Sequence, residues 1–135
     1  KQLNQARSKA GTANGAIEFR AGSMDDLPFD DGSFDLVITS MAIHGVPKEI
    51  RPDAIGEITR VLVPGGKFAL VDWSRPKVGL MAARWILTLV GDMQGDNWQN
   101  RYPEMCRGHG LEPLTDVYLD SLHRCQVFIK PTDVE

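Results

Sequence analysis

Cysteine is scarce in this 135-residue sequence, and long hydrophobic runs are lacking. The two cysteines, Cys106 and Cys125, form no CxxC pair, and no histidine pair at metal-ligand spacing accompanies them. This argues against a metal site and favours two reduced thiols in an intracellular protein. The longest apolar stretch, residues 78–90, is interrupted by Arg84 and is too short to span a bilayer. Because the start also carries no signal peptide pattern, we expect a cytoplasmic protein without a membrane partner.

An excess of charge of one sign is lacking as well. The chain has 15 basic and 18 acidic residues, a formal net charge of −3 and no basic cluster. This argues against nucleic acid as a partner and leaves the charge of a substrate open. The hydrophobic content of 42% is ordinary for a globular protein, and the length suits a single domain with one core.

The most informative stretch covers residues 22–44. Residues 34–39 are a short apolar run with β-branched side chains, and the preceding Asp-Asp-Gly-Ser at 30–33 has turn chemistry. This pattern predicts a strand that is covered on both faces, as in a parallel α/β sheet. The flanking loops, 23–27 and 40–44, would then lie near the carboxyl ends of strands, where ligands bind in open α/β sheets.

Periodicity and turn residues predict the remaining elements. Ile50, Ala54, Ile58 and Leu62 repeat every four residues and predict a helix that begins near Arg51. The other predicted elements are helices at 1–10, 78–90 and 98–107, one helical turn at 24–27, strands at 16–21 and 67–72, turns at 64–66 and 108–110, and a hairpin of strands at 114–119 and 124–130. This order is that of an α/β fold with an antiparallel hairpin at its C-terminal end.

Two runs of the sequence resemble a known family. They are LPFDDGSFDLVITSMAIHGV at 27–46 and EITRVLVPGGKFALVDWSRP at 57–76. They are similar to the class I S-adenosylmethionine-dependent methyltransferases, and closest to the branch of the ubiquinone and menaquinone C-methyltransferases. The resemblance implies a Rossmann-like sheet with the strand order 3-2-1-4-5-7-6. On that match the chain carries strands 3 to 7, whereas the first two strands and the glycine-rich cofactor loop are absent.

The missing strands have a consequence for the strand at 34–39. In the family this strand pairs with strand 1, so here it should present an exposed apolar edge, and such edges pair with something. Two explanations stay open. The chain is an N-terminally truncated part of a longer enzyme, or it is a short protein that completes its sheet by a strand swap or as a homodimer. In either case we expect the 135 residues alone to bind the cofactor poorly.

The resemblance also implies site residues. Ser23 and Met24 match the position that contacts the adenine of S-adenosylmethionine, and Ser40, followed by Met41, matches the position at the methionine end. His44 matches a histidine that faces the substrate, where a neutral imidazole could act as a general base. Four of these residues have a structural alternative: Ser23 is a turn serine, Met24 fills the core, Ser40 is a strand-end serine, and His44 packs under the next helix or only shapes the pocket.

The family implies methyl transfer to a small-molecule acceptor, with quinone precursors as the nearest analogy. Asp72 and Trp73 end a predicted strand and either border the substrate or pack structurally. Trp85, Trp98 and Tyr102 fall in the region that shapes acceptor choice in the family, or else they are packing residues. The alternative function is a non-catalytic oligomerisation or regulatory module that retains the fold.

Overall fold

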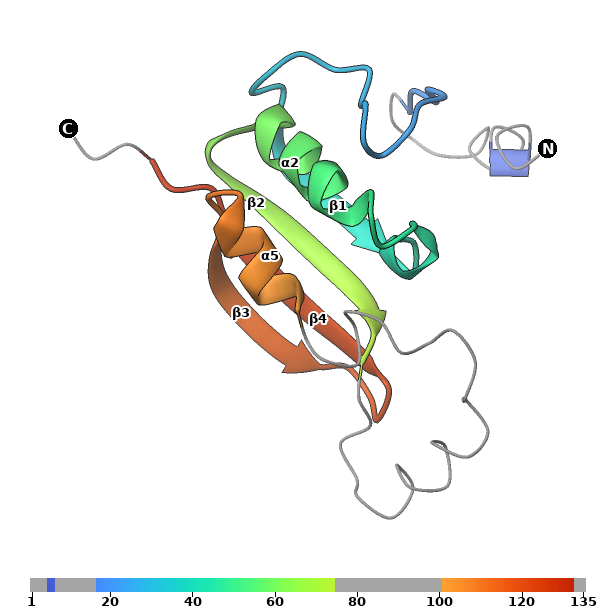
Figure 1. Ribbon diagram of the computed structural model, residues 1–135, viewed down its shortest axis with the longest axis vertical. Helices are drawn as coiled ribbons and strands as arrows, with labels where there is room; N and C mark the ends of the chain where they lie inside the picture. The colour runs from blue at the N-terminus through green and yellow to red at the C-terminus, as the bar shows by residue number, and fades with distance from the viewer. Residues whose placement is uncertain (1–4, 7–16, 75–100, 133–135) are drawn as a thin grey trace.

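The computed structural model describes residues 5–6, 17–74 and 101–132. Its elements are β1 (Phe34–Ser40), the 3-10 helix η1 (Ile43–Gly45), α2 (Arg51–Val61), β2 (Leu62–Trp73), α5 (Tyr102–Gly108), β3 (Glu112–Tyr118) and β4 (His123–Ile129). The four strands form one sheet in the order β1-β2-β4-β3. β1 and β2 run parallel, and the other two pairs are antiparallel. In Figure 1, α2 and α5 lie on the same side of this sheet.

Most of the predicted elements within the described residues are confirmed. The strand at 34–39, the helix from Arg51 and the C-terminal hairpin all form, and the sheet order is the 4-5-7-6 part of the order that the resemblance implied. Within the described part of the helix predicted at 98–107, α5 begins at Tyr102, and residues 98–100 lie outside the described residues. The predicted helix at 78–90 lies outside the described residues, and of the helix at 1–10 only residues 5 and 6 are described, both helical.

The core lies between the sheet and the two helices. The apolar stripe of α2 is buried as its four-residue period predicts, and Phe68 of β2 stacks on Phe128 of β4 with ring centroids 6.0 Å apart. The fully or almost fully buried apolar side chains include Ile43, Ile55, Ile58, Leu62, Phe68, Leu70, Leu111 and Phe128. This single cluster fixes α2 and α5 against one face of the sheet.

The end of α5 shows the predicted glycine cap. Gly110 has a φ of +82°, and the Leu111 N–H donates to the Cys106 carbonyl at 2.9 Å. Glycine adopts this left-handed conformation without the steric cost that a Cβ would bring, so the chain can turn back into β3. Burial raises the pKa of the Cys106 thiol to about 12, so this thiol is a packing group rather than a nucleophile.

The glycine pair at 65–66 was predicted as a turn, but it lies inside β2. Phe34 pairs with Leu62 and Leu36 pairs with Lys67, so β2 carries a bulge opposite the start of β1. The Gly65 N–H donates to the Lys130 carbonyl at 2.7 Å, and the Lys130 N–H donates to the Gly66 carbonyl at 2.9 Å. These two bonds tie the bulge to Lys130, the residue that follows β4. Strand β2 therefore continues through Gly65 and Gly66, although the local sequence predicts a turn there.

The predicted strand at 16–21 is wrong for the residues that are described, because 17–22 have no regular structure. A strand needs a hydrogen-bonding neighbour, and no described strand lies beside this segment. The helical turn predicted at 24–27 is also replaced, by a turn in which Ser23 and Asp26 form an isolated bridge. The course of the chain before β1 is thus set by side-chain contacts rather than by the backbone hydrogen bonds of a sheet.

Arg60 of α2 supplies those side-chain contacts. Its guanidinium donates to the carbonyls of Leu27 and Phe29 at 3.1 and 2.8 Å and pairs with Glu57 at 2.7 Å. Glu57 in turn accepts the Leu27 N–H at 2.8 Å. The hydrogen bond from Arg60, followed by that from the Leu27 backbone, lowers the pKa of Glu57 to about 2. The loop that leads into β1 is therefore tied to α2.

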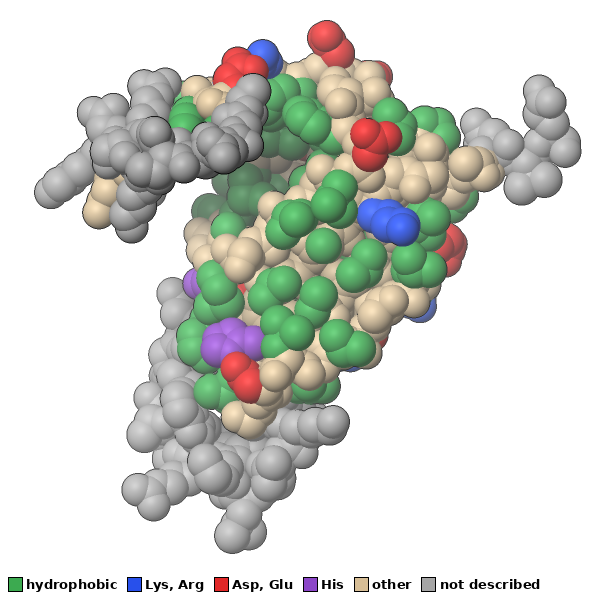
Figure 2. All heavy atoms as spheres, turned by 180° about the vertical axis from the view of Figure 1, so that it is seen from behind, with side chains coloured by type: hydrophobic (Ala, Val, Ile, Leu, Met, Phe, Trp, Pro, Cys, Tyr) green, Lys and Arg blue, Asp and Glu red, His purple; other side chains and the backbone are tan. Residues whose placement is uncertain are grey.

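The face of the sheet opposite α2 and α5 is open among the described residues. Leu36 and Ile38 of β1 are 51% and 61% exposed, and Val117 of β3 is 46% exposed. Figure 2 shows hydrophobic side chains spread over this face. The prediction that the strand at 34–39 is covered on both faces is therefore wrong for the described part of the chain. The predicted free edge is seen there, since β2 is the one described strand that pairs with β1.

Candidate functional site

The carboxyl ends of β1 and β2 lie side by side. Ser40 is in register with Val71, and the Met41 N–H donates to the Val71 carbonyl at 2.8 Å. The loop after β1 therefore starts next to Asp72 and Trp73, which end β2. Parallel pairing thus brings the predicted residues of the 40–44 loop to one edge of the sheet, as their position after the strand required.

At this edge Ser40 is notable for its exposed side chain and Met41 for its backbone conformation. Ser40 is exposed, and its hydroxyl makes no hydrogen bond to any described residue. Met41 has a φ of +52°, and it is the one described non-glycine residue in the left-handed region. Such a backbone is uncommon and occurs often at functional sites. β1 thus ends at Ser40, and the chain turns at Met41.

Buried contacts hold the loop that carries His44. Ile43 is fully buried, while Arg51 at the start of α2 is 6% exposed. The Arg51 guanidinium donates through Nη2 to the His44 carbonyl and through Nε to the Val46 carbonyl, each at 2.8 Å. A charged donor that binds two backbone carbonyls fixes the loop more firmly than a neutral one would. The position of His44 is therefore set by the core and by α2.

His44 pairs with Asp72 across the two strand ends. Its Nδ1 lies 2.7 Å from Asp72 Oδ1, and its backbone N–H donates to Asp72 Oδ2 at 3.1 Å. The Trp73 N–H also donates to Asp72 Oδ1, at 2.8 Å. Asp72 is 3% exposed and the His44 side chain is 39% exposed. The pair thus joins a buried carboxylate to an imidazole that solutes can reach.

Sequence reasoning named both members of this pair but not their contact. His44 was predicted as a substrate-facing residue, and Asp72 as a residue at a strand end. The two are 28 positions apart, and only the parallel register of β1 and β2 brings them together. The position of Asp72 near the end of the strand that follows β1 in the chain is the one sequence signal that could have suggested this pairing.

Ser23 and Met24 lie in a different part of the chain. Met24 is partly buried and packs against the hydrophobic core, and the Ser23 hydroxyl donates to the Asp25 carboxylate. Ser40, Met41 and His44 share the 40–44 loop at the end of β1, and no hydrogen bond between described residues links this loop to Ser23 or Met24.

The two aromatic candidates that are described pack against protein groups. Trp73 lies against His123 with ring centroids 4.5 Å apart, and Asp120 holds that histidine at 2.6 Å. Tyr102 is 2% exposed and belongs to the core. Packing is thus the role that the structure supports for both. Trp85 and Trp98 lie outside the described residues.

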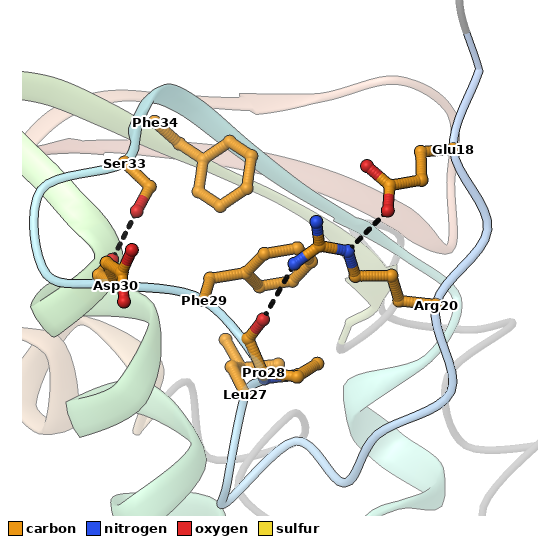
Figure 3. A pocket seen from close by; sticks show the side chains of 8 residues that line it. All are labelled: Glu18, Arg20, Leu27, Pro28, Phe29, Asp30, Ser33 and Phe34. Carbon is orange, nitrogen blue, oxygen red and sulfur yellow. Dashed lines mark hydrogen bonds and ion pairs between the residues drawn. The ribbon is translucent and has the colours of Figure 1, made fainter.

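An open pocket of about 760 Å³ lies at the other end of β1. In Figure 3, Arg20 reaches over the Phe29 ring, with its guanidinium carbon 5.0 Å from the ring centroid. Phe29 meets Phe34, the first residue of β1, edge to face at 4.8 Å. The pocket lies at the amino end of β1, so it contains none of the predicted site residues.

Within 17–74 and 101–132, no three His, Cys, Asp or Glu side chains are grouped as a metal ion would require. In the same part of the chain, no helix is long and apolar enough to cross a membrane.

Comparison with known proteins shows which family the sequence of this chain matches. Residues 1–70 match the family described as "Methyltransferase domain". The ubiquinone/menaquinone biosynthesis C-methyltransferase of Rickettsia peacockii is 37% identical over 124 residues, which are 86% of this chain and 49% of that protein. The chain spans about a quarter to a half of the curated relatives that it matches.

Solved structures agree on the fold. A SAM-dependent methyltransferase from Methanosarcina mazei aligns with a TM-score of 0.80 at 16% identity, over 97% of this chain and 78% of that one. A Burkholderia thailandensis N1-methyltransferase, solved with its substrate and S-adenosylhomocysteine, aligns with a TM-score of 0.69 at 12% identity, over 94% of this chain and 56% of that one. At these identities the likeness concerns the fold alone. Together with the sequence match, it shows that this chain belongs to the class I S-adenosylmethionine-dependent methyltransferase family.

Proposed function

We propose that the full-length protein transfers a methyl group from S-adenosylmethionine to a small-molecule acceptor at the edge formed by β1 and β2. The observation that supports this best is that the loop that carries Ser40, Met41 and His44 lies at the carboxyl ends of two parallel strands. These residues come from the part of the chain that carries the family match. Ligands of open α/β sheets bind at such strand ends.

Two of the described residues suit chemical groups of S-adenosylmethionine. The exposed Ser40 hydroxyl has a free acceptor for an ammonium group, such as that of the methionine part of S-adenosylmethionine. The thioether of the partly buried Met24 offers an apolar, polarisable surface that suits an adenine ring. S-adenosylmethionine, when bound, supplies a methyl group that its sulfonium has already activated. The residues of this chain therefore have to bind, orient and exclude water.

We assign His44 to the acceptor side of the site. Its imidazole is partly exposed and is held at the strand ends by Asp72, so it can meet a substrate without leaving its place. Alignment of the reactants supplies most of the acceleration in such a displacement, and a base adds to it when the acceptor loses a proton. The names of the relatives make a quinone precursor the first acceptor to test. We propose that this reaction takes place in the cytoplasm.

A calorimetric titration of the full-length protein with S-adenosylhomocysteine tests the cofactor assignment. Ser40→Ala should weaken binding by about 10- to 100-fold, because a hydrogen bond to a charged group contributes about 1.5–3 kcal/mol. Ser33→Ala is the matched control at the amino end of the same region, where the Ser33 hydroxyl donates to the Asp30 carbonyl. It should leave the affinity unchanged.

Two outcomes would contradict the assignment. If Ser40→Ala binds as tightly as the wild type, Ser40 does not contact the cofactor. If the full-length wild type does not bind at all, the non-catalytic module becomes the better description. Under that description the free edge of β1, with Leu36 and Ile38 beside it, would serve a homodimer or a strand swap.

A further inference from the structure

The contacts of Asp72 determine where the proton of the His44 ring lies. Backbone N–H groups can only donate, and Asp72 accepts one on each oxygen: from Trp73 on Oδ1 at 2.8 Å and from His44 on Oδ2 at 3.1 Å. Both oxygens therefore face donors, as an ionised carboxylate does. At 2.7 Å from Oδ1, the remaining partner His44 Nδ1 must also be a donor. The neutral ring then carries its proton on Nδ1.

A ring with its proton on Nδ1 has a free lone pair on Nε2. No described residue donates to Nε2, and the His44 side chain is 39% exposed. The charged groups that contact His44 in the described structure are Asp72 from β2 and Arg51 from α2. Arg51 binds the main-chain carbonyl of His44 rather than its ring, so among the described residues it is Asp72 that fixes the tautomer.

We propose that Asp72 is a positioning residue, which holds His44 in the Nδ1–H tautomer so that Nε2 takes a proton from the methyl acceptor. This inference rests on the proposed function and extends it to the class of acceptor. The acceptor would carry an O–H, or an acidic C–H, that loses its proton during the transfer. For a hydroxyl, oxygen forms the bond to the methyl carbon, the carbon–sulfur bond breaks with its electron pair left on sulfur, and the proton passes to Nε2.

The burial of Asp72 favours a positioning role over a surface ion pair. An exposed pair can exchange partners with water, and it constrains a ring weakly. Asp72 is 3% exposed and receives three donors, so rotation of its carboxylate would leave two backbone N–H groups without their acceptor. Asp120 and His123 offer a comparison on the β3–β4 hairpin, where a half-exposed carboxylate binds Nδ1 at 2.6 Å.

The test is a long-range proton–nitrogen NMR spectrum of the histidine rings in the full-length ¹⁵N-labelled protein. The pH is set above 8, where an ordinary imidazole is neutral. In the wild type, His44 should show the Nδ1–H pattern. In Asp72→Ala no side-chain acceptor remains for Nδ1–H, so the His44 signal should lose the Nδ1–H pattern. Asp120→Ala is the matched control, and it should alter His123 while His44 keeps its pattern.

Either of two results would overturn the inference: an Nε2–H pattern for His44 in the wild type, or an unchanged His44 pattern in Asp72→Ala. The wild-type spectrum decides by itself if Asp72→Ala does not fold. The spectrum is recorded without a ligand, so it is independent of the S-adenosylhomocysteine titration. A protein that fails the titration but shows Nδ1–H would lose the proposed function and keep the His44–Asp72 geometry.

Discussion

Phe68→Ala is expected to lower the free energy of unfolding by about 3–5 kcal/mol, the usual cost of truncating a buried phenylalanine to alanine. Phe68 is fully buried on β2, in register with Val37 on one side and Phe128 on the other. It also stacks on the Phe128 ring, which is 1% exposed. The substitution removes the ring that joins the parallel and antiparallel halves of the sheet, and it leaves a cavity behind.

Urea unfolding of the full-length protein, followed by circular dichroism, measures this effect. Leu114→Ala is the control, because this side chain on β3 is 54% exposed and its truncation should change stability by less than about 0.5 kcal/mol. Natural domains are stable by only about 5–15 kcal/mol, so the loss at Phe68 should be a large share of the total. Equal effects of the two substitutions would show that the core lies elsewhere.

Arg51→Ala should cost about 2–3 kcal/mol and should also release the loop that carries His44. Arg51 is 6% exposed, and its loss would leave the carbonyls of His44 and Val46 without a charged donor. Arg51→Lys keeps the charge but offers a single ammonium in place of the planar fork, so its cost should be intermediate.

Urea unfolding gives the stability of both Arg51 variants, and the histidine NMR spectrum reports the state of the loop. The account expects a larger loss for alanine than for lysine, together with a changed environment of His44. A cost below about 0.5 kcal/mol for Arg51→Ala would contradict the role of this side chain as the anchor of the η1 loop.

Local sequence patterns predicted the elements that carry a regular apolar pattern along their own residues. The apolar run at 34–39 and the four-residue period of α2 fall in this group. The predicted strand at 16–21 failed because a strand depends on a neighbour that its own residues do not encode. The bulge at Gly65 was missed for a similar reason, since the bonds that keep it in β2 come from Lys130 near the end of the chain.

The candidate site was predictable one residue at a time but not as an arrangement. The sequence resemblance pointed to Ser23, Met24, Ser40, Met41 and His44, and the parallel register then placed Asp72 beside the loop that carries three of them. The pairing of His44 with Asp72 depends on two strands and on a helix that positions the loop between them. Pairwise contacts of this kind are set by topology, which a linear pattern does not specify.

The most direct test of the proposed site uses the methionine methyl groups of the full-length protein as NMR probes. During titration with S-adenosylhomocysteine, the methyl signals of Met24 and Met41 should shift. The signal of Met105, which packs against the core from α5, should stay in place. If the methyl signals of Met24 and Met41 stay in place while the full-length protein is saturated with S-adenosylhomocysteine, the cofactor does not bind at the carboxyl ends of β1 and β2.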